Sequence, residues 1–145
     1  MLNPKSSILN IFTDGGSRGN PGPAAIGVNA LVDDQVIFQL SKTVGHATNN
    51  FAEYSALIES LKHLLLENIV SPQINFFLDS ELVVKQINGQ YKVKNSGIKL
   101  LYDQVKALIT KLISNGQTPN ISFTHIPREK NKVADSLVNA ALDAK

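Results

Sequence analysis

The chain has 145 residues, of which 43% are hydrophobic and 18% charged, and this predicts one globular domain over 1–145 with a sizeable core. It contains no cysteine, which excludes a disulfide framework and cysteine-based zinc sites and favours a reducing compartment. The formal net charge of +2 is too small to indicate a nucleic-acid partner by itself.

The first residues, 1–7, contain no apolar run that would form a signal peptide or a membrane anchor, and we expect them to be flexible. The longest apolar stretches of the chain are far shorter than the roughly 20 residues that a membrane-spanning helix needs. We therefore expect a cytoplasmic protein that does not associate with membranes.

Three strands are predicted in the first third of the chain. The first is an apolar run that ends at Asp14, and a loop rich in glycine and proline follows it over 15–23. A turn at Asp33 and Asp34 separates the second strand from the third, so an antiparallel meander is expected. The three strands are expected at 8–13, 24–31 and 35–44.

After the meander, helices and strands alternate. Helical spacing of apolar residues, polar caps and Asn-Gly stops predict four helices and two further strands. The order of elements is thus β-β-β-α-β-α-α-β-α, which implies an α/β fold with a mixed sheet covered by helices. The helices are expected at 51–67, 80–87, 98–114 and 131–144, and the strands at 73–78 and 120–125.

Four acidic residues stand where predicted elements begin or end. Asp14 ends the first strand and Asp79 ends the fourth, so parallel pairing of these strands would bring both carboxylates to one edge of the sheet. Glu53 and Asp135 are expected in the first turns of their helices. Four carboxylates from separate elements can therefore converge on one site.

A group of carboxylates this close together is stabilised by a bound cation. Carboxylates that lie close together without compensation repel one another and raise each other's pKa. Hard oxygen ligands suit Mg²⁺ or Mn²⁺ rather than zinc. Two such ions about 4 Å apart can hold the attacking and leaving oxygens of a phosphodiester displacement.

Each acid also has an ordinary structural explanation. Asp79 could cap the next helix, and Asp14 could be a turn residue before two glycines. Glu53 and Asp135 could complement helix dipoles. Taken singly, each acid favours the structural explanation, whereas the four acids together with their surroundings favour the metal site.

Four segments combine these acids with glycines, asparagines and other polar residues in a fixed order. They are Thr13-Asp14-Gly15-Gly16-Ser17-Arg18-Gly19-Asn20-Pro21-Gly22-Pro23-Ala24, Thr48-Asn49-Asn50-Phe51-Ala52-Glu53-Tyr54, Asp79-Ser80 with Val83-Val84-Lys85-Gln86, and Asn131-Lys132-Val133-Ala134-Asp135. Together they resemble the signature motifs of type 1 ribonucleases H. The resemblance extends from about Ile8 to Leu142, and four motifs in the right order are a highly specific signal.

The resemblance implies the ribonuclease H-like fold, a five-stranded mixed sheet with helices on both faces. It also implies Mg²⁺-dependent hydrolysis of the RNA strand of an RNA–DNA hybrid, which leaves 5′-phosphate and 3′-hydroxyl ends. By position, Asp14, Glu53, Asp79 and Asp135 match the family's catalytic, metal-binding acids, and Glu53 also matches the residue near the RNA 2′-hydroxyl. Two ions are expected with substrate bound. No obligate protein partner is inferred, and a monomer is expected.

Substrate contacts are expected in and around the first three motifs. The 2′-hydroxyl distinguishes RNA from DNA at a given site. Main-chain groups after Asp14 can approach a substrate closely because glycine has no side chain, and amide side chains can hydrogen-bond sugar and minor-groove base edges. The resemblance adds contacts of Thr48 and Asn49 with a DNA phosphate, although turn and cap chemistry also explains the asparagines. The residues assigned to substrate contact here are Gly15, Gly16, Ser17, Arg18, Asn20, Thr48, Asn49, Asn50 and Gln86.

His125 ends the fifth strand, ten residues before Asp135. This offset is compatible with the loop histidine that assists product release or proton transfer in some family members. His125 is therefore a candidate catalytic residue, although a lone histidine is more often structural. Arg128 or Lys130, in the loop that follows, could supply a phosphate contact instead.

Lysines are concentrated in the middle third of the chain, where the alternatives are a solvated helix face and a phosphate-binding patch. Some family members carry a basic, tryptophan-containing protrusion between their second and third helices. This chain has no tryptophan and only the short segment 89–97 in that region. We expect a modest affinity for the hybrid, to which Lys92, Lys94 and Lys99 contribute phosphate contacts.

Two alternative functions remain open. The first is a hybrid- or duplex-binding module with decayed catalysis, but a pure binder gains nothing from a group of repelling acids. The second is another ribonuclease H-like nuclease, such as a junction resolvase, which would use similar acids. The Asp-Gly-Gly-Ser and Thr-Asn-Asn sequences favour the ribonuclease over this second alternative.

Overall fold

The computed structural model describes residues 7–144, and this range contains five strands, four α-helices and one turn of 3₁₀-helix. Residues 1–6 and 145 lie outside the described residues, and so does all but Ser7 of the segment that we predicted to be flexible. The strands are β1 (Leu9–Ser17), β2 (Gly22–Val32), β3 (Gln35–Ala47), β4 (Ile74–Leu78) and β5 (Ile121–His125). The helices are α1 (Asn49–Leu66), α2 (Glu81–Ile87), α3 (Ser96–Ser114) and α4 (Lys132–Asp143), and the 3₁₀ turn is η2 (Arg128–Lys130).

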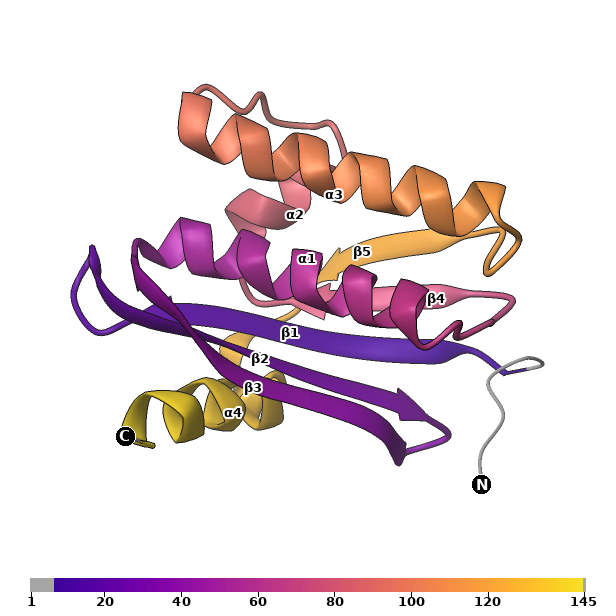
Figure 1. The fold of residues 1–145 in the computed structure, drawn as a ribbon, viewed down its shortest axis with the longest axis horizontal. Coiled ribbons are helices and arrows are strands. Elements are labelled where there is room, and N and C mark those ends of the chain that lie inside the picture. Colours follow the sequence, from indigo (N-terminus) through magenta and orange to yellow (C-terminus); the bar gives the residue numbers. More distant parts are fainter. Residues whose placement is uncertain (1–6, 145) are drawn as a thin grey trace.

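One mixed sheet organises the fold, with the strand order β3-β2-β1-β4-β5. β1, β2 and β3 form the antiparallel meander, and β4 and β5 add to β1 in parallel (Figure 1). The hairpin between β2 and β3 turns at Asp33 and Asp34, whose positive φ angles of 49° and 65° suit a tight two-residue connection. The predicted α/β fold with a five-stranded mixed sheet is therefore confirmed.

The first strand is longer than the sequence predicted. We expected β1 to end at Asp14, but it continues to Ser17, because its antiparallel pairing with β2 extends to Ser17 and Ala24. The expected loop over 15–23 is reduced to the turn between Ser17 and Gly22. The prediction was wrong because adjacent glycines usually mark a loop, whereas here both lie in a strand and Gly15 allows the main chain of α1 to pack closely against it.

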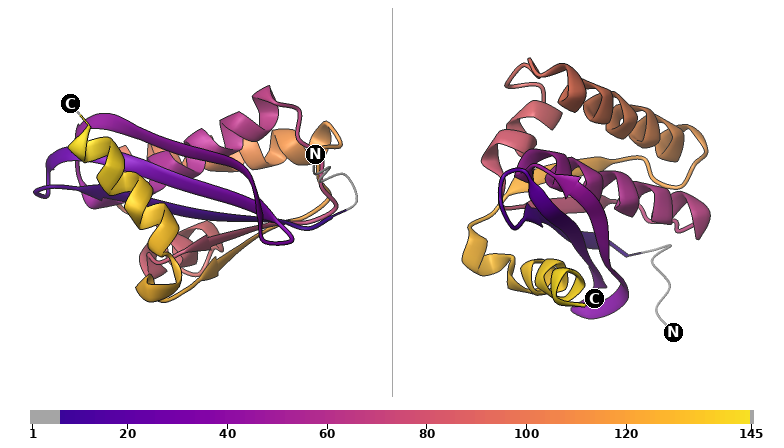
Figure 2. Two further views of the ribbon diagram at one scale, coloured as in Figure 1. Left: turned by 90° about the horizontal axis from the view of Figure 1, so that it is seen from below. Right: turned by 60° about the vertical axis from the view of Figure 1, so that its left-hand side comes forward.

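Helices cover both faces of the sheet (Figures 1 and 2). α1 contributes Leu57 and Leu61 to the main hydrophobic core, and α3 packs against α1 and adds Leu112 to the same core. α4 covers the opposite face, where Val138 packs with Ala25 of β2. Because both of its faces are covered, β2 is buried along nearly its whole length.

Polar caps decide where two helices begin. Thr48 Oγ1 accepts a hydrogen bond of 3.2 Å from the Phe51 N–H, so α1 begins at Asn49. Glu53 therefore lies in the second turn of α1 and not in the first turn, where we predicted it. Asn95 caps α3 by accepting from the Ile98 N–H, so this helix begins two residues earlier than predicted. Over residues 7–144, none of the helices combines the length and the apolar character needed to cross a lipid bilayer.

Candidate active site

Asp14 and Asp79 lie next to each other where the parallel ladder between β1 and β4 ends. The last paired residues of that ladder are Thr13 and Leu78, so each aspartate is the next residue of its own segment. β4 stops at this point, whereas β1 continues alongside β2. The structure thus brings the two carboxylates to the same edge of the parallel ladder, as the sequence predicted.

Two glycines bring the acids of the helices to the same place. A Cβ atom on Gly15 would lie 2.2 Å from the carbonyl group of the residue before Glu53, so β1 and α1 meet backbone to backbone. A Cβ atom on Gly27 would lie 2.1 Å from the carbonyl oxygen of the residue before Asp135, so β2 and α4 meet in the same way. Any other residue at either position would push the helix, and its acid, away from the sheet.

Three of the four acids form a compact cluster. Asp14, Glu53 and Asp79 each offer one carboxylate oxygen, and these oxygens all lie within 4.8 Å of one another. Asp135 is exposed at the edge of this cluster. It lines the same cleft as the other three acids. All four predicted acids therefore meet, with Asp135 at the edge of the group.

The cluster is electrostatically unfavourable without a counter-charge. Burial, and then the charges of Asp79 and Asp135, raise the pKa of Asp14 from its ordinary 3.8 to about 8. Burial and the charges of Asp14 and Asp79 likewise raise the pKa of Glu53 well above its ordinary value, and the Gly15 main chain and the Arg128 charge oppose this. Near neutral pH, the buried part of the cluster therefore favours bound protons over bare negative charge.

The residues present fit a divalent cation. Oε1 of Glu53 is buried and has no hydrogen-bond partner among the described residues. Together with Asp14 and Asp79, it offers hard anionic oxygens, which are the ligands that Mg²⁺ and Mn²⁺ prefer. A cation at this point would take the place of the protons and would pair with the otherwise unsatisfied Glu53 oxygen.

The acids line an open cleft of about 450 Å³. Its walls come from β1, the first two turns of α1, the segment between β4 and α2, η2 and α4, which are far apart in the sequence. Four residues to which the sequence analysis assigned no role in the site also line it, namely Ser80, Val138, Asn139 and Leu142. The predicted site residues that line it are Asp14, Gly15, Gly16, Ser17, Arg18, Asn49, Asn50, Glu53, Asp79, Arg128 and Asp135.

Hydrogen bonds connect the turn after β1 to the start of α1. The Ser17 N–H donates to Asn49 Oδ1 at 2.9 Å, and the Asn49 N–H donates to Asn20 Oδ1 at 3.0 Å. Turn and cap chemistry is therefore present at Asn20, Thr48 and Asn49, as the alternative explanation required. Asn20 and Thr48 are not among the described residues that line the cleft, whereas Asn50 is.

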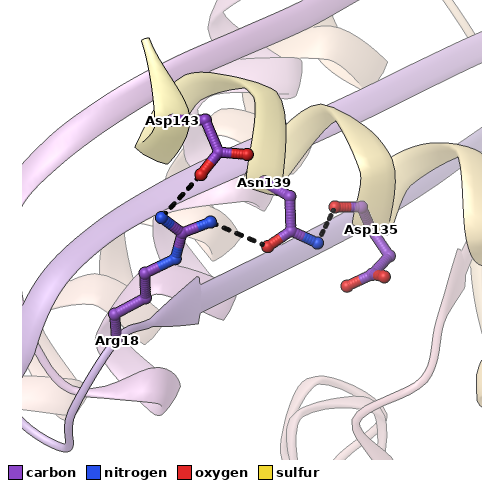
Figure 3. A network of polar contacts seen from close by, with 4 residues as sticks. All are labelled: Arg18, Asp135, Asn139 and Asp143. Atoms are coloured by element: carbon purple, nitrogen blue, oxygen red, sulfur yellow. Dashed lines mark hydrogen bonds and ion pairs between the residues drawn. The ribbon is translucent and has the colours of Figure 1, made fainter. Parts of the chain in front are cut away.

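Arg18 reaches from the same turn across to α4 (Figure 3). Its guanidinium forms an ion pair of 2.7 Å with Asp143 and donates to Asn139 Oδ1 at 3.4 Å. Asn139 Nδ2 in turn donates to the main-chain oxygen of Asp135 at 3.2 Å. The Arg18 side chain therefore connects the rim of the cleft to the helix that carries Asp135.

Besides Asn20 and Thr48, four further predicted residues lie outside the lining of the cleft. Gln86 is buried on α2, and its Oε1 accepts a hydrogen bond of 2.7 Å from the Tyr54 hydroxyl. His125 is exposed at the end of β5, and Lys92 and Lys94 are exposed between α2 and α3. The geometry thus separates these residues from the eleven predicted residues, the four acids among them, that line the cleft.

One buried polar residue near the acids was missed by the sequence reasoning. Asn131 is 1% exposed, and its Nδ2 donates to Asp79 Oδ2 at 3.2 Å. The sequence placed Asn131 at the start of the last helix, where asparagine is a common cap residue. The signal for another role was its place at the start of the fourth motif, four residues before Asp135.

Comparison with known proteins identifies the family of this chain. Residues 12–141 match the family model described as "Reverse transcriptase-like". The bifunctional protein Rv2228c of Mycobacterium tuberculosis is 39% identical over 136 residues, which cover 92% of this chain and 35% of that protein. Ribonuclease HI of Halobacterium salinarum is 37% identical over 136 residues, which cover 93% of this chain and 64% of that protein. The chain thus spans about a third of the first relative's length and less than two thirds of the second's.

Solved structures share both the fold and a substantial part of the sequence. LC11-RNase H1, isolated from compost, was solved in complex with an RNA/DNA hybrid; it is 41% identical, with a TM-score of 0.85, and the match covers 93% of this chain and 96% of that one. The N-terminal RNase H domain of Rv2228c is 37% identical, with a TM-score of 0.83, and the match covers 94% and 99% of the two chains. The motifs, the sheet topology and these similarities agree, and the chain belongs to the reverse transcriptase-like family as a type 1 ribonuclease H.

Proposed function

We propose that this protein is an endonuclease that hydrolyses the RNA strand of RNA–DNA hybrids with divalent cations held by Asp14, Glu53, Asp79 and Asp135. The observation that carries the proposal is the carboxylate cluster of Asp14, Glu53 and Asp79, whose oxygens lie within 4.8 Å of one another in an open cleft that Asp135 also lines. The similarity to LC11-RNase H1, a protein solved in complex with an RNA/DNA hybrid, supports the choice of substrate. We further propose that the protein acts as a monomer without an obligate protein partner.

Mg²⁺ is the proposed cofactor, with two ions when the substrate is bound and Mn²⁺ as a possible substitute. Bound cations of this kind activate water and stabilise the departing 3′ oxygen, which would leave 5′-phosphate and 3′-hydroxyl ends. Asp14 and Glu53 give up their protons when they become ligands, since a carboxyl group must be ionised to coordinate a metal. Asp79 and Asp135 complete the set of ligands, with Asp135 on the solvent side.

The cleft offers several groups that can position a nucleic-acid strand. A Cβ atom on Gly16 would meet only Val138 Cγ1, at 3.7 Å, so the main chain at Gly16 is open to close approach from the cleft. Asn50 is exposed on the rim and can hydrogen-bond a sugar or base edge. Arg128 is close enough to lower the pKa of Glu53 and can contact a phosphate. Glu53 is proposed to lie near the RNA 2′-hydroxyl.

Residues outside the lining of the cleft are proposed as secondary contacts. Lys92 and Lys94 would contact phosphates at a distance from the acids. Gln86 already accepts from the Tyr54 hydroxyl, which leaves its Nε2 donors for a base edge. His125 would assist product release or proton transfer.

The test is a cleavage assay on an RNA–DNA hybrid with each strand labelled in turn, with and without Mg²⁺. We expect the labelled RNA strand to be cut only when Mg²⁺ is present and the DNA strand to remain intact. Duplex DNA and a four-way junction serve as parallel substrates. Preferential cutting of the junction would replace the proposal by a resolvase-like activity, and hybrid binding without cleavage in either Mg²⁺ or Mn²⁺ would replace it by a binding module.

A further inference from the structure

Asn131 lies at the junction of β1, β4 and α4, beside the acid cluster and 1% exposed. It is the N-cap residue of α4, yet its side chain makes no capping hydrogen bond. Asparagine at an N-cap usually accepts a hydrogen bond from the first turn of its own helix. The side chain of Asn131 therefore does not cap its own helix. Its hydrogen bonds to other segments indicate a different role.

The amide nitrogen of Asn131 bridges the two strands that carry aspartates. Nδ2 donates to the main-chain oxygen of Thr13 at 2.9 Å and to Asp79 Oδ2 at 3.2 Å. Thr13 directly precedes Asp14, so one amide group restrains Asp79 through its carboxylate and Asp14 through its neighbour. Both amide hydrogens have a partner in this arrangement.

The main chain of Asn131 also forms a hydrogen bond with a third acid of the site, Asp135. The carbonyl oxygen of Asn131 accepts a hydrogen bond of 3.1 Å from the Asp135 N–H. Asn131 is thus bonded to Asp79, to Asp135 and to the residue before Asp14. Glu53, which α1 brings from the opposite face of the sheet, is the one acid of the four that it does not restrain in this way.

The amide oxygen of Asn131 shows that packing alone does not explain why an asparagine stands at this position. Oδ1 of Asn131 is buried and has no hydrogen-bond partner among residues 7–144. A buried acceptor without a partner is unfavourable, and an apolar side chain of the same shape would avoid that penalty. The donor side of Asn131 is therefore the part that the site uses.

We propose that Asn131 is a positioning residue, which holds the Asp79 carboxylate and the neighbouring segments so that the acids bind a divalent cation. The inference rests on the proposed function, because it assigns a role in the same metal site. A carboxylate with one oxygen bonded to a buried donor has less freedom to rotate. Loss of an outer hydrogen-bond partner of this kind typically weakens metal binding or activity by about 10- to 100-fold.

The experiment measures Mn²⁺ binding without nucleic acid, by following free Mn²⁺ with electron paramagnetic resonance. Asn131→Ala removes the amide, and Asn131→Leu replaces it with an apolar side chain of similar shape. The matched control is Asn88→Ala, since Asn88 is also a helix cap residue whose Nδ2 donates to a strand carbonyl, that of Phe123, at 3.1 Å. We expect both Asn131 variants to bind Mn²⁺ at least about tenfold more weakly than the wild type, and Asn88→Ala to bind it unchanged.

The Mg²⁺ dependence of cleavage gives a second test, because a purely structural role of Asn131 would not change it selectively. The Asn131 variants should need at least about tenfold more Mg²⁺ for half-maximal cleavage, while the KM for the hybrid at saturating Mg²⁺ stays within twofold of the wild type. Unchanged Mn²⁺ affinity in folded Asn131 variants would overturn the positioning role and leave the nuclease assignment intact. Absence of Mn²⁺ binding to the wild type would instead overturn the metal site itself.

A measurement on the wild type decides the question if the variants do not fold. The side-chain amide signals of Asn131 and Asn88 can be followed by ¹⁵N nuclear magnetic resonance during a Mg²⁺ titration. We expect the Asn131 signals to shift, because the carboxylate to which it donates becomes a ligand, and the Asn88 signals to stay in place. Asn131 signals that do not respond to Mg²⁺ would contradict the proposal.

Discussion

The acid cluster and the lysines around the α2–α3 connection are both polar, but they are built differently. With Asp135 at its edge, the cluster takes its acids from β1, α1, α4 and the residue after β4, and Asp14 and Glu53 are buried. The lysine-rich surface, which we define as Lys85, Lys92, Lys94, Lys99 and Lys106, comes from α2, α3 and the segment between them.

Contacts of the lysine-rich surface are mostly local. Lys85 pairs with Glu81 at 3.2 Å and Lys99 pairs with Asp103 at 2.7 Å, each four residues away on its own helix. Lys106 donates to the main-chain oxygen of Ile87 at 2.7 Å. In the described part of the chain, no salt bridge within 4.0 Å involves the two lysines of the connecting segment, Lys92 and Lys94.

The difference shows where a single substitution should matter. Buried charges from separate elements interact strongly and are held in place by the whole fold, so one change there affects the entire site. Exposed charges interact weakly, are screened by salt and act one at a time. Substitutions in the acid cluster should therefore have large effects, and substitutions in the lysine-rich surface should have small, additive ones.

The largest expected effect comes from neutralising a single acid of the cluster. Asp14→Asn or Asp79→Asn removes a metal ligand with almost no change of volume, so each should reduce Mg²⁺-dependent hybrid cleavage by more than about 1,000-fold, on the scale of a lost catalytic group. Circular dichroism should show an unchanged fold. Asp103→Asn, an exposed control, should keep full activity, and wild-type turnover by either cluster variant would refute the metal site.

The next largest effect concerns the backbone contact that positions Glu53. Gly15→Ala would place a Cβ atom 2.2 Å from the main chain of α1 and should lower the free energy of unfolding by about 3 kcal/mol or more. Gly16→Ala is the matched control, because its nearest neighbour would be Val138 Cγ1 at 3.7 Å; it should change stability by less than about 1 kcal/mol. Urea unfolding of both variants measures the difference, and equal stabilities would contradict the described contact.

Stability of the metal-free protein should depend on pH through the same acids. The pKa of Asp14 is about 8 in the folded chain against an ordinary 3.8, and that of Glu53 is also raised. The folded state therefore keeps protons that the unfolded state releases above about pH 4, so the free energy of unfolding should fall as pH rises from about 4 to about 8. One such carboxyl contributes a slope of at most about 1.4 kcal/mol per pH unit.

Asp14→Asn is the control for this pH dependence, since it removes one of the raised groups. In urea unfolding with a chelator present, the variant should gain stability relative to the wild type between pH 4 and pH 8. Mg²⁺ should stabilise the wild type more at pH 8 than at pH 5, because fewer protons compete with it. A wild-type stability that rises with pH relative to the variant would contradict the raised pKa of Asp14.

The smallest expected effect belongs to the lysine-rich surface. If Lys92 and Lys94 each contact one phosphate, Lys92→Ala/Lys94→Ala should weaken hybrid binding and reduce the slope of log affinity against log salt by about 2. Lys111→Ala, near the far end of α3, is the control and should leave the slope unchanged. Binding measured by fluorescence anisotropy at several salt concentrations tests this, and an unaltered slope in the double variant would exclude these contacts.

The sequence predicted the elements of the fold and the acids of the site, because both leave local patterns. Apolar runs and caps mark the elements, and Asp14 and Asp79 could be paired because parallel strands align their ends. The continuation of β1 past Asp14 was missed, since adjacent glycines indicate a loop until the close contact of Gly15 with α1 is known. Asn131 was missed because its position predicts a cap, whereas its side chain bonds to groups more than 50 residues away in the chain.

Gly15 and Gly27 lie on neighbouring strands, and each faces a different helix. At these two glycines no side chain lies between the sheet and the helices α1 and α4. The distance between the two helices therefore depends on the dimensions of the main chain and not on the volume of any side chain. Leucines and phenylalanines elsewhere in the interior can then be exchanged during evolution while the separation of Glu53 and Asp135 stays constant. The protein can thus adjust its stability to a new temperature without altering the spacing of the residues that carry the reaction.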